Sequence, residues 1–163
     1  MIVLGIDPGL ASTGIAVLVG KGSRLTADLL TTVKTKPATP HAERLLALYR
    51  GVSDVLEAYA IEAASVESWF VHPVSRSAMG MAEARGALLT AVAAGGVAVT
   101  EYTPNAIKQA VSGSGRADKA QVRAMVTRLT GANPTSDHEA DALAAAICHL
   151  GAQPFAAAVG RAK

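Results

Sequence analysis

The order of the apolar segments along the chain constrains its fold more than any other feature. Residues 1–6 (MIVLGI) form a short β-branched run that stops at an Asp-Pro-Gly turn, and residues 13–19 (TGIAVLV) form a second run. Residues 25–33 make a third, less regular strand, because Ala27 and Asp28 interrupt it. Short connections that contain glycine favour antiparallel pairing. The start of the chain therefore predicts a three-stranded meander.

The rest of the chain alternates between helical and strand patterns. Apolar residues at helical spacing predict a helix over residues 41–59, and residues 63–67 (AASVE) predict a fourth strand. Further along, the pattern predicts a fifth strand at 97–102 and helices at 75–94, 104–111, 118–129 and 137–150. A strand reached through a helix lies parallel to its neighbour. We therefore expect an α/β fold, a mixed five-stranded sheet flanked by helices on both faces.

Length and composition exclude several classes of protein. The 163 residues, half of them hydrophobic, suffice for one domain with a substantial core, and no long charged run indicates disorder. Cys148 has no partner for a disulfide, and no stretch of about 18 apolar residues is present that could span a membrane. The N-terminal apolar run lacks the basic residues of a signal peptide. We expect a cytoplasmic protein with a single domain at residues 1–152 and a frayed tail at 153–163.

Charge is unevenly spread along the chain, although the net charge is only +2. Residues 105–130 carry five basic residues and one acid, a balance of +4, whereas residues 131–150 carry three acids and a balance of −3 with their histidines neutral. A basic segment beside an acidic one suits a metal-dependent enzyme that binds a polyanion. It also suits an ordinary pair of solvated helices, so the charge pattern leaves both interpretations open.

Three acidic residues and a histidine are poorly explained by packing. Asp7 ends the first predicted strand and Glu67 ends the fourth, so parallel neighbouring strands would bring both to one edge of the sheet, where open α/β sheets bind ligands. Asp141 is in phase with the apolar residues of the last helix, and His138 shares its face at i, i+3. Each acid also has an ordinary interpretation: a turn-forming aspartate, a solvated strand end, or an acid at a helix start.

Taken together, these four side chains predict a metal site. Three carboxylates and one imidazole form an oxygen-rich donor set that suits a divalent cation. Two such cations about 4 Å apart can activate water and stabilise the leaving oxygen in phosphodiester cleavage. None of the acids is specific alone, but their joint placement favours a nuclease.

Four segments give the chain a resemblance to a known family. They are GIDPG (residues 5–9) followed by Thr13-Gly14, the strand end Val66-Glu67, QAVSGSGRADKAQV (109–122) and DHEADALAAAI (137–147). In this order they resemble the RuvC family of Holliday-junction resolvases, the crossover junction endodeoxyribonucleases, over nearly the whole chain. The resemblance implies a ribonuclease-H-like fold, a homodimer, and metal-dependent hydrolysis of symmetric strands in a four-way DNA junction during recombination and repair.

The resemblance also assigns the active site. It carries the family's catalytic and metal-binding residues onto Asp7, Glu67, His138 and Asp141; His138 stands where the family commonly has aspartate, one place after Asp137. It implies two divalent cations, Mg²⁺ or Mn²⁺, in each active site during catalysis, and products with 5′-phosphate and 3′-hydroxyl ends. Because imidazole is a softer ligand than carboxylate, we expect a preference for Mn²⁺.

Contacts to DNA follow from the same resemblance. Lys108 and Lys119 match basic residues that the family places near the scissile phosphate. In the family an aromatic residue at the position of Phe70 stacks on unpaired bases at the junction centre, whereas Trp69 is left open between DNA contact and core packing. The remaining candidates for phosphate binding are Arg116 and Arg76.

The partners implied by the resemblance are a second copy of the chain and the branch-migration proteins RuvA and RuvB. We expect the dimer interface on the predicted helix at 75–94, whose small and apolar residues allow close packing between subunits. The same residues could instead pack on the sheet of their own subunit. These candidates are Ala78, Met79, Ala82, Gly86 and Leu89.

Three other functions fit part of the sequence. GIDPG with Thr13-Gly14 resembles the first phosphate loop of actin-, Hsp70- and sugar-kinase-type phosphotransferases, but those need two such domains, more than 163 residues provide. A non-catalytic junction-binding module is disfavoured, because clustered carboxylates repel DNA unless metals compensate them. Another ribonuclease-H-like nuclease, acting on RNA–DNA hybrids or in rRNA processing, is the third, and residues 109–122 favour the junction resolvase over it.

Overall fold

The computed structural model describes residues 1–68 and 76–160, with Arg76 and residues 154–160 described by their backbone alone. The predicted elements are all present. The strands are β1 (Ile2–Asp7), β2 (Ser12–Lys21), β3 (Arg24–Lys34), β4 (Ala63–Glu67) and β5 (Val99–Tyr102). The helices are α1 (His41–Ala58), α2 (Arg76–Ala94), α3 (Pro104–Ser112), α4 (Lys119–Thr130) and α5 (Asp137–Gly160).

The five strands form one mixed sheet in the order β3-β2-β1-β4-β5. β1, β2 and β3 make the expected antiparallel meander. β4 pairs parallel with β1, and β5 pairs parallel with β4. The predicted topology is therefore confirmed, and it brings the carboxyl ends of β1 and β4 together at one edge of the sheet.

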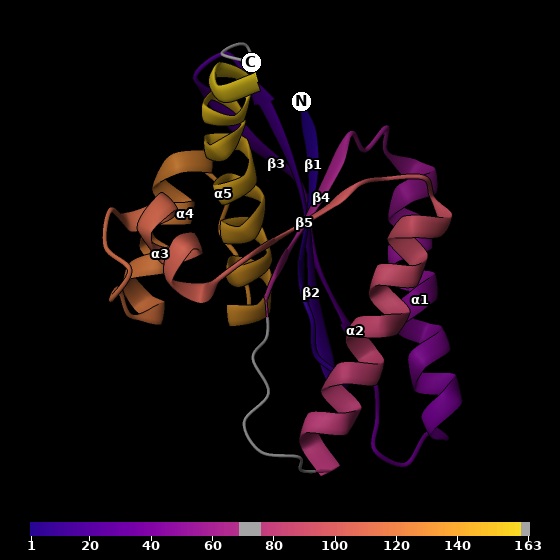
Figure 1. Ribbon diagram of the computed structural model, residues 1–163. Helices are drawn as coiled ribbons and strands as arrows, with labels where there is room; N and C mark the ends of the chain where they lie inside the picture. The colour runs from indigo at the N-terminus through magenta and orange to yellow at the C-terminus, as the bar shows by residue number, and fades with distance from the viewer. Residues whose placement is uncertain (69–75, 161–163) are drawn as a thin grey trace.

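Helices cover both faces of the sheet, as predicted (Figure 1). On one face α1 and α2 pack against even-numbered residues of β1, represented by Leu4 and Ile6. On the other face α5 lies against the sheet, with α3 and α4 outside it (Figure 1). α5 is buried from Ala142 to Cys148, between the sheet and these two outer helices. Its alanine-rich sequence suits this position, because small side chains allow close packing on both sides.

Two glycines let α5 approach the sheet closely. A Cβ atom at Gly5 of β1 would lie 2.0 Å from the backbone oxygen of Ala142, and one at Gly14 of β2 would lie 1.9 Å from that of His138. Real Cβ atoms do not come so close to backbone, so both positions require glycine. The close contact fixes the first turns of α5 over the carboxyl end of β1.

The C-terminal helix differs from its predicted extent. α5 continues to Gly160, whereas the sequence pattern predicts its end at residue 150. Alanine has the highest helix propensity, which explains why the helix continues past Gly151. Pro154 lacks the N–H that would bond to the carbonyl of Leu150, and the frayed tail expected at residues 153–163 stays a prediction. None of the helices within the described segments has the length and apolar character needed to cross a membrane.

Candidate active site

Asp7 and Glu67 end two adjacent parallel strands. β1 and β4 are in register up to Ile6 and Val66, and each acid is the next residue of its strand. Side chains alternate along a strand, and Gly5 contacts α5, so the side chain of Asp7 is directed to the same face. The expected convergence of the two strand-end acids is thus built into the sheet register.

The turn after Asp7 is held by hydrogen bonds from the second strand. The buried Thr13 hydroxyl donates to the carbonyl of Gly9 at 2.7 Å and accepts from its N–H at 3.3 Å. On the other side, Arg44 of α1 donates from its Nε to the hydroxyl of Thr35, which itself donates to the carbonyl of Leu10. These bonds fasten the Asp-Pro-Gly turn and thereby fix the position of Asp7.

The polar residues at the start of α5 have different partners. Glu139 is 7% exposed and accepts hydrogen bonds from the backbone N–H and hydroxyl of Thr135, while Ser136 accepts from the Glu139 N–H at 3.2 Å. Glu139 therefore closes the first turn of the helix, as in a capping box. Its carboxylate is committed to the fold, which leaves the other three polar residues of this turn for the site.

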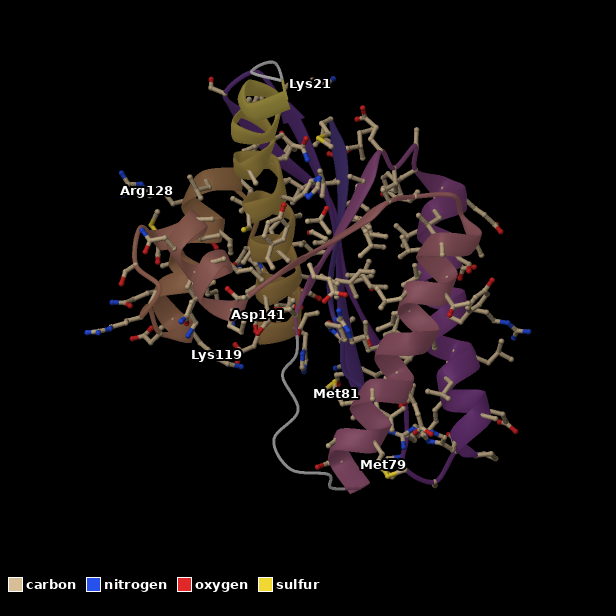
Figure 2. The ribbon with its side chains drawn as sticks, viewed as in Figure 1. Lys21, Met79, Met81, Lys119, Arg128 and Asp141 are labelled. Carbon is tan, nitrogen blue, oxygen red and sulfur yellow. The ribbon has the colours of Figure 1, made fainter. Side chains whose placement is uncertain are left out.

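These three residues face the strand ends and α4. The Nδ1 atom of His138 lies 2.7 Å from Oδ2 of Asp7. The Nζ atom of Lys119 lies 3.5 Å from Oδ2 of Asp137 and 4.0 Å from Oδ2 of Asp141, and Figure 2 shows Lys119 beside Asp141. The start of α5 thus contacts β1 through His138 and α4 through its two aspartates.

The carboxylates of Asp7, Glu67 and Asp141 are electrostatically linked. Burial is the main cause that raises the pKa of each of the three carboxyl groups. The negative charge of Asp141 further raises the pKa of Asp7, and the charges of Asp7 and Asp141 further raise the pKa of Glu67. Lys119 opposes this effect at all three. Mutual repulsion of this kind places the three acids in one region that demands positive charge.

Glu67 lines two cavities at this edge of the sheet. One, of about 140 Å³, is lined by Asp7, Pro8, Glu67, Ser68, Met81 and Arg85. The other, of about 200 Å³, is lined by Glu67, Pro104, Ile107, Lys108, Lys119, Val122 and Asp141. The second cavity therefore combines two of the predicted catalytic acids with the two lysines that were predicted to bind DNA.

The turn between α3 and α4 carries the other described basic candidate, Arg116, which is exposed. Gln109 braces this turn by donating to the carbonyl of Gly113 at 2.9 Å and accepting from the N–H of Gly115 at 3.0 Å. Gly113 ends α3 with a φ of 75°, in the left-handed region that favours glycine. Asp118 begins α4 with a capping box, which directs the following Lys119 toward α5.

Some predicted DNA contacts cannot be compared with the structure. Phe70 and Trp69 lie outside the described residues. Arg76 begins α2, and only its backbone is described. Their assignments stay predictions.

One residue near the site was not anticipated from the sequence. Arg85 of α2 has a side chain only 13% exposed; its Nη1 donates to the backbone oxygen of Glu67 at 2.9 Å, and its Nη2 lies 2.7 Å from Oε1 of Glu101. No local signal distinguishes it from a solvated arginine on an alanine-rich helix. Its role becomes visible only when α2 is placed beside the ends of β4 and β5.

The donor set, rather than a preformed cage, supports metal binding. Within residues 1–68 and 76–160 no three His, Cys, Asp or Glu side chains are grouped closely enough to hold an ion as they stand. Asp7 and His138 are instead joined to each other. Yet three mutually repelling carboxylates and one imidazole at one edge fit a divalent cation in charge and in ligand chemistry.

Known proteins with the same sequence features share this fold. A family model described as crossover junction endodeoxyribonuclease RuvC matches residues 3–149. A protein of that name from Parvibaculum lavamentivorans is 45% identical over 147 residues, which cover 90% of this chain and 84% of the relative. A Thermus thermophilus RuvC structure is 36% identical with a TM-score of 0.86, and the alignment covers 96% of this chain and 97% of that one. Thermus thermophilus RuvC in complex with a Holliday junction substrate gives a TM-score of 0.90 at 36% identity, with 96% of both chains covered.

Proposed function

Because the chain belongs to the RuvC family of crossover junction endodeoxyribonucleases, we propose that it cleaves four-way DNA junctions with Asp7, Glu67, His138 and Asp141 as its active site. It is a nuclease with a ribonuclease-H-like fold that acts on Holliday junctions in recombination and repair. The observation that carries the site assignment is the cavity shared by Glu67, Asp141, Lys108 and Lys119. A phosphodiester nuclease needs acidic side chains that bind a cation close to basic side chains that bind the phosphate.

The acids and the histidine would hold the divalent cations, two per site during catalysis. When bound, such cations lower the pKa of a coordinated water and stabilise charge on the leaving oxygen, which gives 5′-phosphate and 3′-hydroxyl ends. Asp7 and Glu67 would supply ligand oxygens from rigid strand ends. The start of α5 would supply an imidazole nitrogen from His138 and a carboxylate oxygen from Asp141. Because the backbone of α5 packs directly on Gly5 and Gly14, the side chains at the start of α5 stay aligned with those at the strand ends.

Lys108 and Lys119 are the residues that would bind the phosphate beside these acids. Lys119 is 70% exposed and lies 4.0 Å from Asp141, so its ammonium is free to reach a phosphate oxygen without leaving the cavity edge. Asp137, 3.5 Å from the same ammonium, keeps it near the site. We therefore assign to Asp137 the role of positioning Lys119, and to His138 the role of metal ligand. Arg116 would contact phosphates farther along the strand.

An imidazole in the ligand set predicts a preference for Mn²⁺ over Mg²⁺. The substitution His138→Asp should weaken this preference, because it restores a purely carboxylate set. The measurement is the single-turnover rate in each metal for both proteins. Equal wild-type rates in Mn²⁺ and Mg²⁺ would remove the hypothesis.

A homodimer would place two such sites on the two symmetric strands of a junction. The exposed face of α2 suits that contact, because Met79, Ala82 and Gly86 lie on it at helical spacing and Met79 is 57% exposed (labelled in Figure 2). Ala78, also considered for the interface, is buried within its own subunit. Ala82→Arg should therefore give monomers in sedimentation and abolish paired nicking. A dimer that survives this substitution would move the interface elsewhere.

Phe70, three residues after Glu67, would act at the junction centre, and Arg76 would bind phosphate. Base stacking on Phe70 needs no sequence readout and contributes about 1–3 kcal/mol per base. We also propose RuvA and RuvB as partners and the cytoplasm as the compartment, because both follow from a role in processing junction DNA.

Cleavage of a labelled mobile four-way junction, beside linear duplex and RNA–DNA hybrid, tests the proposed function. Each substrate is incubated with Mn²⁺, Mg²⁺ or EDTA. We expect paired symmetric nicks in the junction only, and only with a metal. Junction binding without cleavage in either metal would indicate a binding module, and cleavage of the hybrid instead would replace the substrate.

A further inference from the structure

The backbone carbonyl of Glu67 lacks its regular donor in the sheet. The N–H of Ser68 donates to the carbonyl of Tyr102 on β5 at 2.7 Å. Backbone groups of successive strand residues point to opposite neighbours, so the carbonyl of Glu67 points toward β1. Continuing the register of Ile6 with Val66 by one residue pairs Asp7 with Glu67, and the donor that a parallel ladder would use is then the N–H of residue 8.

Residue 8 is a proline, which has no N–H to donate. The Asp-Pro-Gly turn that presents Asp7 thus leaves an acceptor unpaired at the end of the neighbouring strand. A buried carbonyl without a donor is destabilising, and nearly all such groups in native structures find a partner.

Arg85 provides the missing donor from outside the sheet. Its Nη1 lies 2.9 Å from the Glu67 oxygen, and it lines the same cavity as Pro8 and Glu67. Its Nη2 is paired at 2.7 Å with Glu101, which is the register partner of Val66 on β5. One guanidinium therefore ties α2 to the last peptide of β4 and to the adjacent strand.

We propose that Arg85 is a positioning residue for Glu67: it replaces the N–H that Pro8 cannot donate and so fixes the peptide from which the Glu67 carboxylate projects. The proposal rests on the assignment of Glu67 to the active site. An arginine suits this role better than a lysine, because its planar group donates to two acceptors at once in a fixed geometry.

The first test compares Arg85→Met and Arg85→Lys with Arg128→Met. Arg128 is exposed on α4, far from α2 (Figure 2), and controls for loss of an arginine. We expect Arg85→Met to lower the single-turnover cleavage rate by about 10–100-fold and to reduce the rise in melting temperature produced by Mn²⁺. Junction affinity in EDTA should stay within about twofold, because Arg85 is not placed on DNA. Arg85→Lys should reduce the cleavage rate less than Arg85→Met does. An unchanged cleavage rate in Arg85→Met would overturn the proposal.

The second test uses Pro8→Ala, which returns an N–H to the ladder. If Arg85 replaces that N–H, then Arg85→Met should reduce cleavage several-fold less in the Pro8→Ala background than in wild type. An equal loss in both backgrounds would overturn the proposal, because the arginine would then act independently of the missing donor. If Arg85→Met does not fold alone, its refolding by Pro8→Ala supports the proposal and its failure to refold in that background overturns it.

Cleavage by the wild-type protein distinguishes a failure of this inference from a failure of the proposed function. Failure of wild type to cleave junctions with metal would contradict the proposed function, whatever Arg85 does. Cleavage by wild type and by Arg85→Met at the same rate would leave the nuclease intact and remove only the positioning role.

Discussion

Substitution of Gly5 by alanine tests whether the close packing of α5 on the sheet sets the geometry of the proposed active site. The added Cβ would lie 2.0 Å from the backbone oxygen of Ala142, against at least 3.4 Å for ordinary contact, so α5 must retreat locally by about 1.4 Å. The obstacle is helix backbone, which cannot rotate away as a side chain would. Ala142 adjoins Asp141, so the same displacement moves a carboxylate of the proposed active site away from Glu67.

Gly5→Ala should therefore affect stability and catalysis together. Overpacking a core costs about 1–3 kcal/mol, and we expect the upper end here. A loss of about 3 kcal/mol lowers the melting temperature of a chain of this size by roughly 6–12 °C. A catalytic group misplaced by about 1 Å can cost about 10²-fold in rate.

Urea unfolding and single-turnover junction cleavage measure the two effects. Gly151→Ala is the matched control, because Gly151 lies exposed in the same helix and a Cβ atom added there would have open space around it. It should gain up to about 1 kcal/mol from helix propensity and keep full activity. The reasoning is refuted if Gly5→Ala unfolds within about 0.5 kcal/mol of wild type and cleaves at the wild-type rate.

Three further predictions concern charge. Glu67→Gln should raise the unfolding free energy by about 0.5–2 kcal/mol in EDTA while abolishing cleavage, because burial and neighbouring acids penalise its carboxylate; a destabilised variant would contradict this. Burial lowers the pKa of His149 from 6.5, so the unfolded state binds more protons and stability falls as pH drops below about 6.5. In urea denaturation, His149→Gln should lose less unfolding free energy than wild type between pH 7 and 5. Parallel plots of unfolding free energy against pH for the two proteins would refute this prediction. Lys119→Ala should reduce the log–log salt slope of junction binding by about 0.9, whereas Arg128→Ala leaves it unchanged; equal slopes for both variants would exclude a phosphate contact at Lys119.

The strand ends of the site were predictable because their signals are local. An apolar run that stops at an acid identifies Asp7 and Glu67, and the helical connection to β4 makes the two strands parallel. The three-residue spacing on α5 predicts only that His138 and Asp141 share a face of the helix. Their assignment as metal ligands rests on the resemblance to the RuvC family.

Other features depend on contacts between distant parts of the chain. In the segment from Asp137 to Asp141, composition does not reveal that Glu139 closes the helix start while Asp137 pairs with Lys119. Arg85 acquires its partners only when α2 lies beside two strand ends. The end of α5 was placed too early, because Gly151 resembles a stop signal although the alanine-rich sequence around it favours helix.

The most direct test of the central claim is the single-turnover rate of Asp7→Asn on a four-way junction in Mn²⁺. Junction affinity in EDTA is measured alongside, so that loss of chemistry is separated from loss of binding. If the three acids form one metal-dependent active site, the rate should fall by at least about 10²–10³-fold with affinity unchanged or higher. Cleavage by Asp7→Asn at close to the wild-type rate would contradict the account, because the chemistry would then take place elsewhere.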